Sequence, residues 1–429
     1  MLRTAEFHDF YLCDLVSLRL SNFQTISLPP SHEGSKETTK CVTSVNNSGI
    51  TGIKINLFTF RLHTQSSTMI ILISILALVL VYWFIFLQPK FGKNPRGKRL
   101  DRILKSPNYK SNSFQNPTET EVLLKGTSMA KMTRDFLFGK PTSTRPPKPL
   151  PSIKTDLKNL SSEHPTIVWF GHSSYLIKSK NFNILVDPVM QGHASPLTFF
   201  GKPFEGSDVY KIDDLPPIDL VLLTHDHYDH LHYESIKKLA STANYFVTSL
   251  GVGEHLESWG VPLEKITELD WWESTSIANE ITLTATPARH FSGRSFVRGK
   301  TLWSAFVLKI HGYQLFLGGD SGYGDHFKEI GKKFSSFDIA LLECGQYGVN
   351  WPYIHMLPEQ TVMAAKELNA KTLMPVHWAK FDLSLHSWDE PIHLAIKYAS
   401  EINQQITTPM IGEPVVLNSN YPSKRWWKI

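Results

Sequence analysis

Histidine and aspartate side chains gather in one short stretch, "LLTHDHYDHLH" (residues 222–232), at the end of an apolar run. Alternate side chains of an extended segment point to the same side, so His225 and His227 point together and form half of a metal site. Asp229 and His230 follow the next turn and can address a second ion beside the first. Buried core histidines would all need polar partners at once, which makes that reading costly. A solvated polar loop is the remaining alternative.

The surrounding sequence predicts the elements that position this stretch. Short runs of β-branched, aliphatic and aromatic residues, bounded by Gly, Pro, Asn or Asp, are typical of strands. They include "TIVWF", "IDLVLLT", "ITLTATP", "YQLFLGG" and "DIALLEC". Helices are expected at Tyr233 to Ala240 and at Pro358 to Leu368. We therefore expect an α/β (α+β) fold with two β-sheets face to face and helices outside, and the histidines on a loop where a strand ends.

Composition narrows the class of partner and the type of metal site. The formal net charge is +5 and the Lys and Arg residues are spread out, so no nucleic-acid partner is expected. Three cysteines, Cys13, Cys41 and Cys344, lie far apart without a CxxC pair. This argues against a disulfide framework and against a thiolate zinc site. Any metal must be held by histidine and carboxylate.

One apolar run, from Met69 to Leu87, contains Ser74 as its only polar residue. This predicts a single transmembrane helix over residues 69–88. A basic segment follows from Lys90, so the positive-inside rule places the catalytic domain on the cytoplasmic side of a single-pass membrane protein. No small-x-small cleavage site follows the run, which disfavours a cleaved signal peptide.

Three other regions complete the predicted organisation. Residues 1–68 show no sustained period and are predicted to form a poorly structured N-terminal extension. Because Met69 begins the apolar run, one hypothesis is that the natural chain starts there and that residues 1–68 are an upstream extension of the reading frame. Residues 89–162 form a basic and then Pro-rich tether, partly packed on the catalytic domain of residues 163–429.

The "HDHYDH" pattern, HxHxDH, resembles the signature of the metallo-β-lactamase fold superfamily. Further candidate donors follow at expected strand ends in "TPARHFSGR", "LFLGGDSGYG" and "LMPVHWAKF". From about Asn94 onward the chain resembles bacterial relatives of the N-acylphosphatidylethanolamine-hydrolysing phospholipase D. That resemblance depends on "WFGHSSYLI", "PARHFSGR", "GDSGYGDHF", "HMLPEQTV" and "PVHWAKFDLSLHSWDEP", and it does not cover residues 1–68. It implies a four-layer αββα sandwich.

The resemblance also implies two zinc ions per chain. The first would be held by His225, His227 and His290, and the second by Asp229, His230 and His377, with Asp320 bridging them. Zinc suits nitrogen and oxygen donors. Manganese or iron could also occupy a pair of sites that contains carboxylates.

Other residues are candidates for catalytic or supporting roles. Asp187, after "ILV", is a candidate hydrogen-bond acceptor from a ligand imidazole, with an Asp-Pro turn as the alternative. His355 and His386 are candidates to contact phosphate or to protonate the leaving oxygen, with surface histidines as the alternative. Together with Asp229 they are the candidate catalytic residues.

The predicted function is hydrolysis of N-acylphosphatidylethanolamine to N-acylethanolamine and phosphatidate by a membrane-anchored, zinc-dependent phosphodiesterase. The expected partners are a phospholipid substrate and a membrane, and homo-oligomerisation is left open. One alternative is a hydrolase of a small phosphorylated metabolite or lactone. Another is a non-catalytic membrane adaptor on the same fold, which would be expected to have lost at least one of the seven donors.

Overall fold

The computed structural model describes residues 69–84, 87–160, 163–294 and 297–429. The chain divides into two compact units, one that contains Pro89–Ile429 and one that contains the helix over residues 69–84. The predicted N-terminal extension, residues 1–68, lies outside the described residues.

Two seven-stranded sheets form the centre of the larger unit. The first has the strand order β15 (Gln405–Ile406), β14 (Ala370–Val376), β13 (Phe337–Glu343), β12 (Tyr313–Leu317), β11 (Ala305–Ile310), β10 (Ile281–Thr286) and β9 (Ser274–Ala278). The second has the order β16 (Pro414–Val416), β3 (Thr166–Trp169), β4 (Tyr175–Ser179), β5 (Phe182–Val186), β6 (Leu220–Leu223), β7 (Tyr245–Ser249) and β8 (Ile266–Leu269). A short ribbon, β1 (Tyr109–Lys110) with β2 (Ser113–Phe114), stands apart from both.

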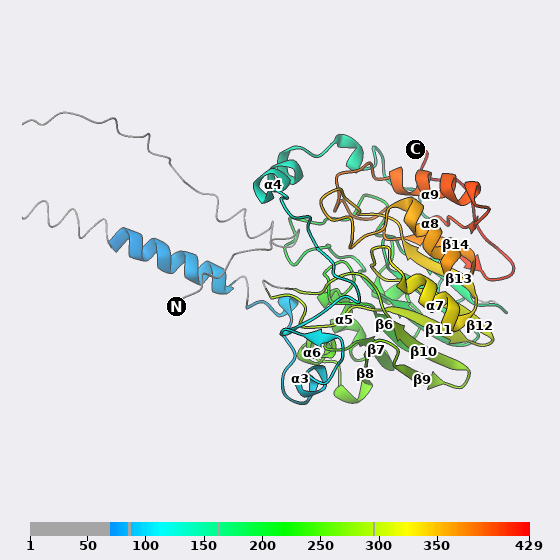
Figure 1. Cartoon of the computed structure of the whole chain (residues 1–429), viewed down its shortest axis with the longest axis horizontal. Helices are drawn as coiled ribbons and strands as arrows, with labels where there is room; N and C mark the ends of the chain where they lie inside the picture. Colours follow the sequence, from blue (N-terminus) through cyan, green and yellow to red (C-terminus); the bar gives the residue numbers. More distant parts are fainter. Residues whose placement is uncertain (1–68, 85–86, 161–162, 295–296) are drawn as a thin grey trace, which may run out of the picture. The chain divides into compact units, whose positions relative to one another are not determined.

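Among the described residues of this unit, the α-helices are α3 (Gly97–Ile103), α4 (Met129–Phe138), α5 (Tyr233–Leu239), α6 (Gly253–Ser258), α7 (His326–Phe334), α8 (Pro358–Glu367) and α9 (Glu390–Glu401). Single 3-10 turns occur at Pro89–Phe91, Thr142–Thr144, Ile212–Asp214 and Leu263–Lys265. Both predicted helices are present as α5 and α8. Figure 1 shows α7, α8 and α9 grouped beside β11–β14, and α5 and α6 grouped beside β6–β8.

Strand β6 explains the layered packing. Its Leu220 and Leu222 pack into the core between the two sheets, whereas Val221 and Leu223 pack into a second core that includes Ile236 of α5. All four side chains are buried, so the strand is apolar on both faces. A third core lies between α7, α8 and α9 and the outer face of the other sheet. The order is therefore helix, sheet, sheet, helix, as expected.

The predicted transmembrane helix is not supported. Within the described ranges, no helix combines the length and the apolar character needed to cross a bilayer. The prediction of a single-pass membrane protein with its catalytic domain on the cytoplasmic side is therefore wrong.

The segment that precedes the sheets is bound to them by specific contacts. The Arg99 guanidinium of α3, whose side chain is 8% exposed, forms ion pairs with Glu254 and Glu268 at 2.6 Å each. The Asn116 side chain donates to the carbonyl of His290 and accepts from its N–H. The two Asn116 bonds hold the segment against the loop that carries His290, one of the predicted metal donors.

Candidate metal centre

The predicted donors all follow the ends of strands. The histidine stretch follows β6, His290 follows β10, Asp320 follows β12 and His377 follows β14. Strands β12, β13 and β14 are parallel to one another, as are β5, β6 and β7, so their carboxyl ends gather at one edge of each sheet. The core between the sheets brings the two edges together.

The first donor group consists of His225, His227, His290 and Asp320. His225 Nε2 and His290 Nε2 lie 2.9 and 3.2 Å from His227 Nδ1. Asp320 Oδ2 lies 3.6 Å from His290 Nε2 and 3.9 Å from His225 Nε2. All four residues are buried, and their donor atoms lie within 4.8 Å of one another, away from bulk water.

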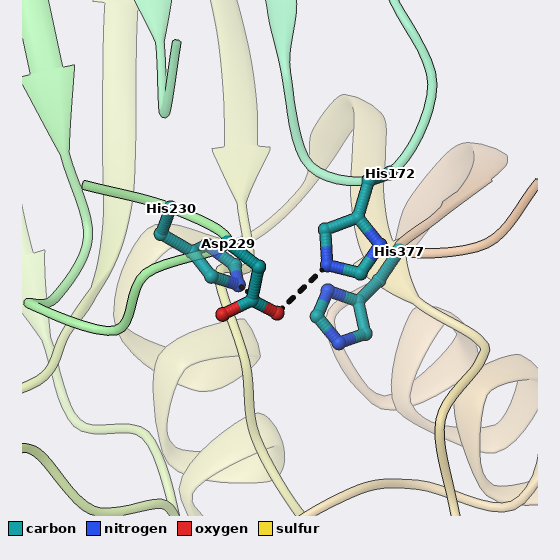
Figure 2. A group of neighbouring side chains, drawn as sticks. All are labelled: His172, Asp229, His230 and His377. Carbon is teal, nitrogen blue, oxygen red and sulfur yellow. Dashed lines mark hydrogen bonds and ion pairs between the residues drawn. The ribbon is translucent and has the colours of Figure 1, made fainter. Parts of the chain in front are cut away.

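The second donor group consists of His172, Asp229, His230 and His377 (Figure 2). The other carboxylate oxygen of Asp320, Oδ1, lies 3.2 Å from His230 Nε2 and 3.1 Å from His377 Nδ1. The two oxygens of Asp320 therefore face different groups, as a bridging carboxylate requires. A third set, Asp320 with His355 and His377, also has metal-like spacing.

The spacing and hydrogen bonding of the donor atoms are better explained by a pair of bound cations than by hydrogen bonds among the donors. His230 Nε2 and Asp320 Oδ1 are close, yet neither makes a hydrogen bond to the described residues. Donors of a tetrahedral zinc at about 2.0 to 2.1 Å lie roughly 3.3 Å apart, which is close to the spacings in both groups. Buried polar atoms without partners are costly, and a bound ion would satisfy them.

The pKa values fit the same assignment. Burial lowers the pKa of His227 to about 4, and it lowers the pKa of His225 and His290 well below the usual range. These imidazoles are neutral at pH 7, which is the form that binds a metal. His230 is the exception. Burial opposes its charged form, but Asp320 and the other nearby carboxylates outweigh burial and raise its pKa well above the ordinary value.

Three of the predicted ligand imidazoles are oriented by a hydrogen bond at Nδ1, the nitrogen that faces away from the metal position. His230 Nδ1 donates to Asp187 Oδ2 at 2.7 Å, and His290 Nδ1 donates to the carbonyl of Ile354 at 2.9 Å. His225 Nδ1 lies 3.0 Å from the hydroxyl of Thr224, which itself donates to Asp187 Oδ2 at 2.7 Å. Such bonds fix which nitrogen carries the proton.

A buried pair lies directly beside the donors. His355 Nδ1 is 3.2 Å from Glu343 Oε2, and Glu343 is the last residue of β13. Burial raises the pKa of Glu343 to about 7. Burial lowers the pKa of His355, but the neighbouring carboxylates outweigh burial and raise it overall. The arrangement leaves Nε2 as the His355 nitrogen available for a substrate.

A cavity of about 110 Å³ opens over both donor groups. Besides donors from both groups it is lined by His355, by Arg298 and by a set of apolar side chains: Leu123, Met132, Phe200, Phe291, Trp351 and Leu383. Leu123 and Met132 belong to the segment that precedes the sheets. The site therefore combines charged groups at its base with largely apolar walls.

The structure brings the seven predicted donors together, and it places Asp187 against His230 and His355 at the cavity. It does not bring His386 there. His386 lies in a separate small cavity beside Trp388, with its ring stacked on Tyr347 at 4.2 Å. The role of each residue in metal binding or catalysis stays a prediction.

Sequence reasoning missed three residues, His172, Glu343 and Asn116. Glu343 ends an apolar strand, a position like those of the predicted donors, so its location was a usable signal. His172 lies in "GHSS" after "TIVWF", also at the end of a strand. Nothing local distinguishes Asn116.

The comparisons with known proteins agree with this geometry. Residues 182–378 match the family model described as the beta-lactamase superfamily domain. An uncharacterised protein of Mycobacterium tuberculosis is 33% identical over 328 residues, which cover 76% of this chain and 88% of that protein. The chain belongs to the beta-lactamase superfamily. The predicted α/β metallo-β-lactamase-like fold is thereby confirmed, and the donor groups make the protein a metal-dependent hydrolase of this superfamily.

Two further relatives carry a named activity. The N-acyl-phosphatidylethanolamine-hydrolyzing phospholipase D 1 of Caenorhabditis elegans is 29% identical over 50% of this chain and 64% of that protein. The mitochondrial N-acyl-phosphatidylethanolamine-hydrolyzing phospholipase D of Saccharomyces cerevisiae is 34% identical over 52% of this chain and 49% of that protein. The chain thus spans less than two thirds of each of these two relatives.

Proposed function

We propose that this superfamily member is a phosphodiesterase of the phospholipase D type, which hydrolyses N-acylphosphatidylethanolamine to N-acylethanolamine and phosphatidate. The observation that carries the proposal is a cavity with two metal-donor groups at its base and apolar walls above them. The two named phospholipase D relatives support the same reaction type.

When bound, two divalent cations would lower the pKa of a shared water and neutralise charge that builds on the phosphoryl oxygens. The first group would hold one ion and the second group the other, with the two Asp320 oxygens facing one each. Zinc is the expected metal, since the donors are imidazole and carboxylate. This arrangement needs no serine or cysteine nucleophile.

The side chains above the donors have separate tasks in this reaction. Arg298 lines the cavity and supplies a permanent positive charge for a phosphodiester. His355 is held on Nδ1 by Glu343, so that Nε2 can give a proton to the leaving oxygen of the N-acylethanolamine. The water oxygen bonds to phosphorus, the bond from phosphorus to that leaving oxygen breaks, and phosphatidate remains.

The apolar walls favour a substrate with acyl chains. Leu123, Met132 and Trp351 line the cavity, and Met132 packs with Trp351 in a small core at its side. Burial of apolar surface contributes about 25 cal/mol per Å², so a chain laid against these side chains adds binding energy that a purely polar substrate lacks.

The size of the cavity supports a second candidate. The cavity measures about 110 Å³, so a phospholipid must leave most of its chains outside it, whereas a compact phosphorylated metabolite or lactone would leave less of itself outside. Both substrates present an oxyanion to the donors, so the wall residues would decide between them.

A substrate panel tests the proposal. Metal-loaded protein is given N-acylphosphatidylethanolamine, a lysophospholipid, a sugar-phosphate lactone and a cephalosporin, and the products are identified by mass spectrometry. We expect N-acylethanolamine as the main product. Turnover of the lactone alone would favour the second candidate and overturn the first.

The His227→Ala variant is the control for metal dependence, because it removes the imidazole at the centre of the first group. We expect it to lose turnover and to bind less metal while its circular dichroism spectrum stays that of a folded protein. Full activity in this variant would end the assignment of a two-metal site.

A further inference from the structure

The second donor group contains a histidine outside the seven predicted donors, His172. It lies in the turn between β3 and β4, and its side chain is fully buried. The ring packs 3.9 Å from the ring of His377, measured between centroids, and 5.0 Å from that of Phe381. Figure 2 shows its edge directed at the carboxylate of Asp229.

That edge makes the polar contact of the ring. His172 Nε2 lies 2.9 Å from Asp229 Oδ2. A carboxylate accepts, so Nε2 carries the proton and donates it. The other nitrogen, Nδ1, has no hydrogen-bond partner in the described part of the chain. The hydrogen bond to Asp229 is therefore what determines the tautomer of His172.

Asp229 depends on this contact in turn. Its side chain is 14% exposed, more than any other member of its group. The nearest other charged partner is His230 Nε2, 3.8 Å from Oδ2, which is too long for a hydrogen bond. Among the described residues, His172 is thus the one donor that holds the Asp229 carboxylate inside the site.

The backbone fixes His172 in an uncommon conformation. Its φ is 53°, in the left-handed region that only a few per cent of residues other than Gly adopt, although His is found there more often than most. Its N–H donates to the carbonyl of Trp378 at 2.9 Å, and its carbonyl accepts from the N–H of His377 at 2.8 Å. The turn is thereby bound to the end of β14, which carries a predicted donor of its own.

These features together indicate a functional residue. A left-handed backbone and an unpaired buried nitrogen are both unfavourable, and such features persist where the surrounding structure enforces them, often at functional sites. We propose that His172 is a positioning residue, which holds Asp229 in the orientation needed at the second metal position. The inference rests on the proposed metal-dependent function but not on any particular substrate.

Metal binding tests the proposal without reference to activity. Purified wild-type, His172→Phe and His172→Gln proteins are stripped with a chelator and titrated with zinc against a competing indicator. Phe keeps the packing on His377 but removes the donor, and Gln keeps an N–H donor. We expect two ions per wild-type chain, with the second bound about 10- to 100-fold more weakly in His172→Phe. Binding in His172→Gln should recover part of that loss.

Cobalt replaces zinc in a second measurement, because its visible absorption reports the ligands of each ion. In His172→Phe the bands of the more tightly bound ion should stay unchanged and those of the second ion should shift or vanish. The His311→Phe variant is the matched control. It removes an imidazole hydrogen bond, to Ser179 at 2.8 Å, from a hairpin remote from the donors, and it should bind both ions normally.

Three results separate the outcomes. Wild-type affinity for both ions in folded His172→Phe would overturn the proposal. Equal loss in His172→Phe and His172→Gln would overturn the hydrogen-bonding role, since the ring itself would then be a ligand. A wild-type protein that binds no metal would overturn the proposed function instead. Should His172→Phe not fold, His172→Asn tests the same point, because Asn tolerates the left-handed backbone but is too short to reach Asp229.

Discussion

Asp187 determines the tautomers of two predicted metal ligands, His230 and His225, and its replacement by Asn should weaken metal binding by both. Its Oδ2 accepts from His230 Nδ1 and from the hydroxyl of Thr224, each at 2.7 Å, and its Oδ1 accepts from the N–H of Thr224 at 2.9 Å. The Thr224 hydroxyl in turn accepts from His225 Nδ1 at 3.0 Å. The carboxylate therefore keeps a proton on Nδ1 of both imidazoles, so that Nε2 is the nitrogen that binds a metal once the ring is neutral.

An amide cannot accept on both sides. Because the N–H of Thr224 cannot move, the Asp187→Asn side chain must keep its oxygen there and turn its NH₂ toward His230 and the hydroxyl. The least costly response is a change of tautomer, which a neutral imidazole allows. His230 would then carry its proton on Nε2, and the reversed hydroxyl would impose the same change on His225. Both nitrogens that face the metal positions would be blocked.

The magnitudes follow from these three hydrogen bonds. Each changes from a bond to a charged group to a neutral one, which costs about 1 kcal/mol per bond, so the metal-free variant should lose about 3 kcal/mol of unfolding free energy in urea. Metal affinity should fall at least 10- to 100-fold, equivalent to about 1.4 to 2.7 kcal/mol. Chelator competition measures the affinity.

Ser174→Ala is the matched control for Asp187→Asn. Its hydroxyl donates to the Asp187 carbonyl at 2.6 Å and accepts from the N–H of Val189 at 3.1 Å, so it stabilises the same turn without touching an imidazole. We expect it to lose about 1 to 3 kcal/mol of stability and to keep its metal affinity. If Asp187→Asn binds both ions as tightly as the wild type does, the tautomer reasoning is refuted.

Four further predictions concern the pH dependence of metal binding and of stability, the preceding segment and metal removal. Because the pKa of His230 is raised, the second ion must displace a proton from His230, whereas His227, with its pKa lowered to about 4, is already neutral. The second ion should therefore leave before the first as pH falls from 8 to 5. Simultaneous loss of both ions would contradict this. In the metal-free protein, the pKa of His230 is raised above its unfolded value of about 6.5, so its contribution to stability is complete below that pH and is lost as pH rises through the folded pKa. Asn116→Ala should lower the unfolding free energy in urea by about 1 to 3 kcal/mol, because both backbone groups of His290 lose a partner, and an unchanged midpoint would refute this. Removal of the metal with a chelator should lower the midpoint of thermal unfolding. The lost stability is about 2.7 kcal/mol if the free metal concentration was 100 times the dissociation constant before the chelator was added. A midpoint that does not change with chelator would argue against tightly bound ions.

The local part of the site could be predicted because its chemistry is encoded within a few residues. The spacing of His225 and His227 places both on one side of an extended segment, and Asp229 and His230 follow immediately. The first pair converges as expected, with 2.9 Å between the two ring nitrogens. Strand ends could likewise be predicted from apolar runs, since β6 is buried on both faces.

The remainder of the site depends on contacts that no local pattern encodes. His172 reaches Asp229 because a turn of one sheet is bonded to the end of β14 in the other. Asn116 lies far from His290 in sequence, and its role follows from two hydrogen bonds that only the folded chain brings about. His386 was predicted as a site residue because it follows a strand, as the donors do. In the structure its ring stacks on Tyr347, outside the site.

The transmembrane prediction failed for a related reason. Hydropathy counts apolar residues in a window, and the run from Met69 to Leu87 satisfies that count. It does not test whether those residues form one helix with the length and the apolar character that a span requires together. Among the residues that the structure describes, no helix has both.

The metal centre is assembled from both sheets, so the core between them sets its dimensions. The histidine stretch extends from β6 of one sheet, whereas Asp320 and His377 follow β12 and β14 of the other. Leu222, Leu317 and Val376, at or near the ends of those three strands, all lie in the inter-sheet core. A close-packed core transmits small displacements instead of absorbing them. The position of Asp320, with one oxygen toward each donor group, therefore depends on the apolar packing directly beneath it, and the two-sheet architecture sets the dimensions of the candidate site more than any single loop does.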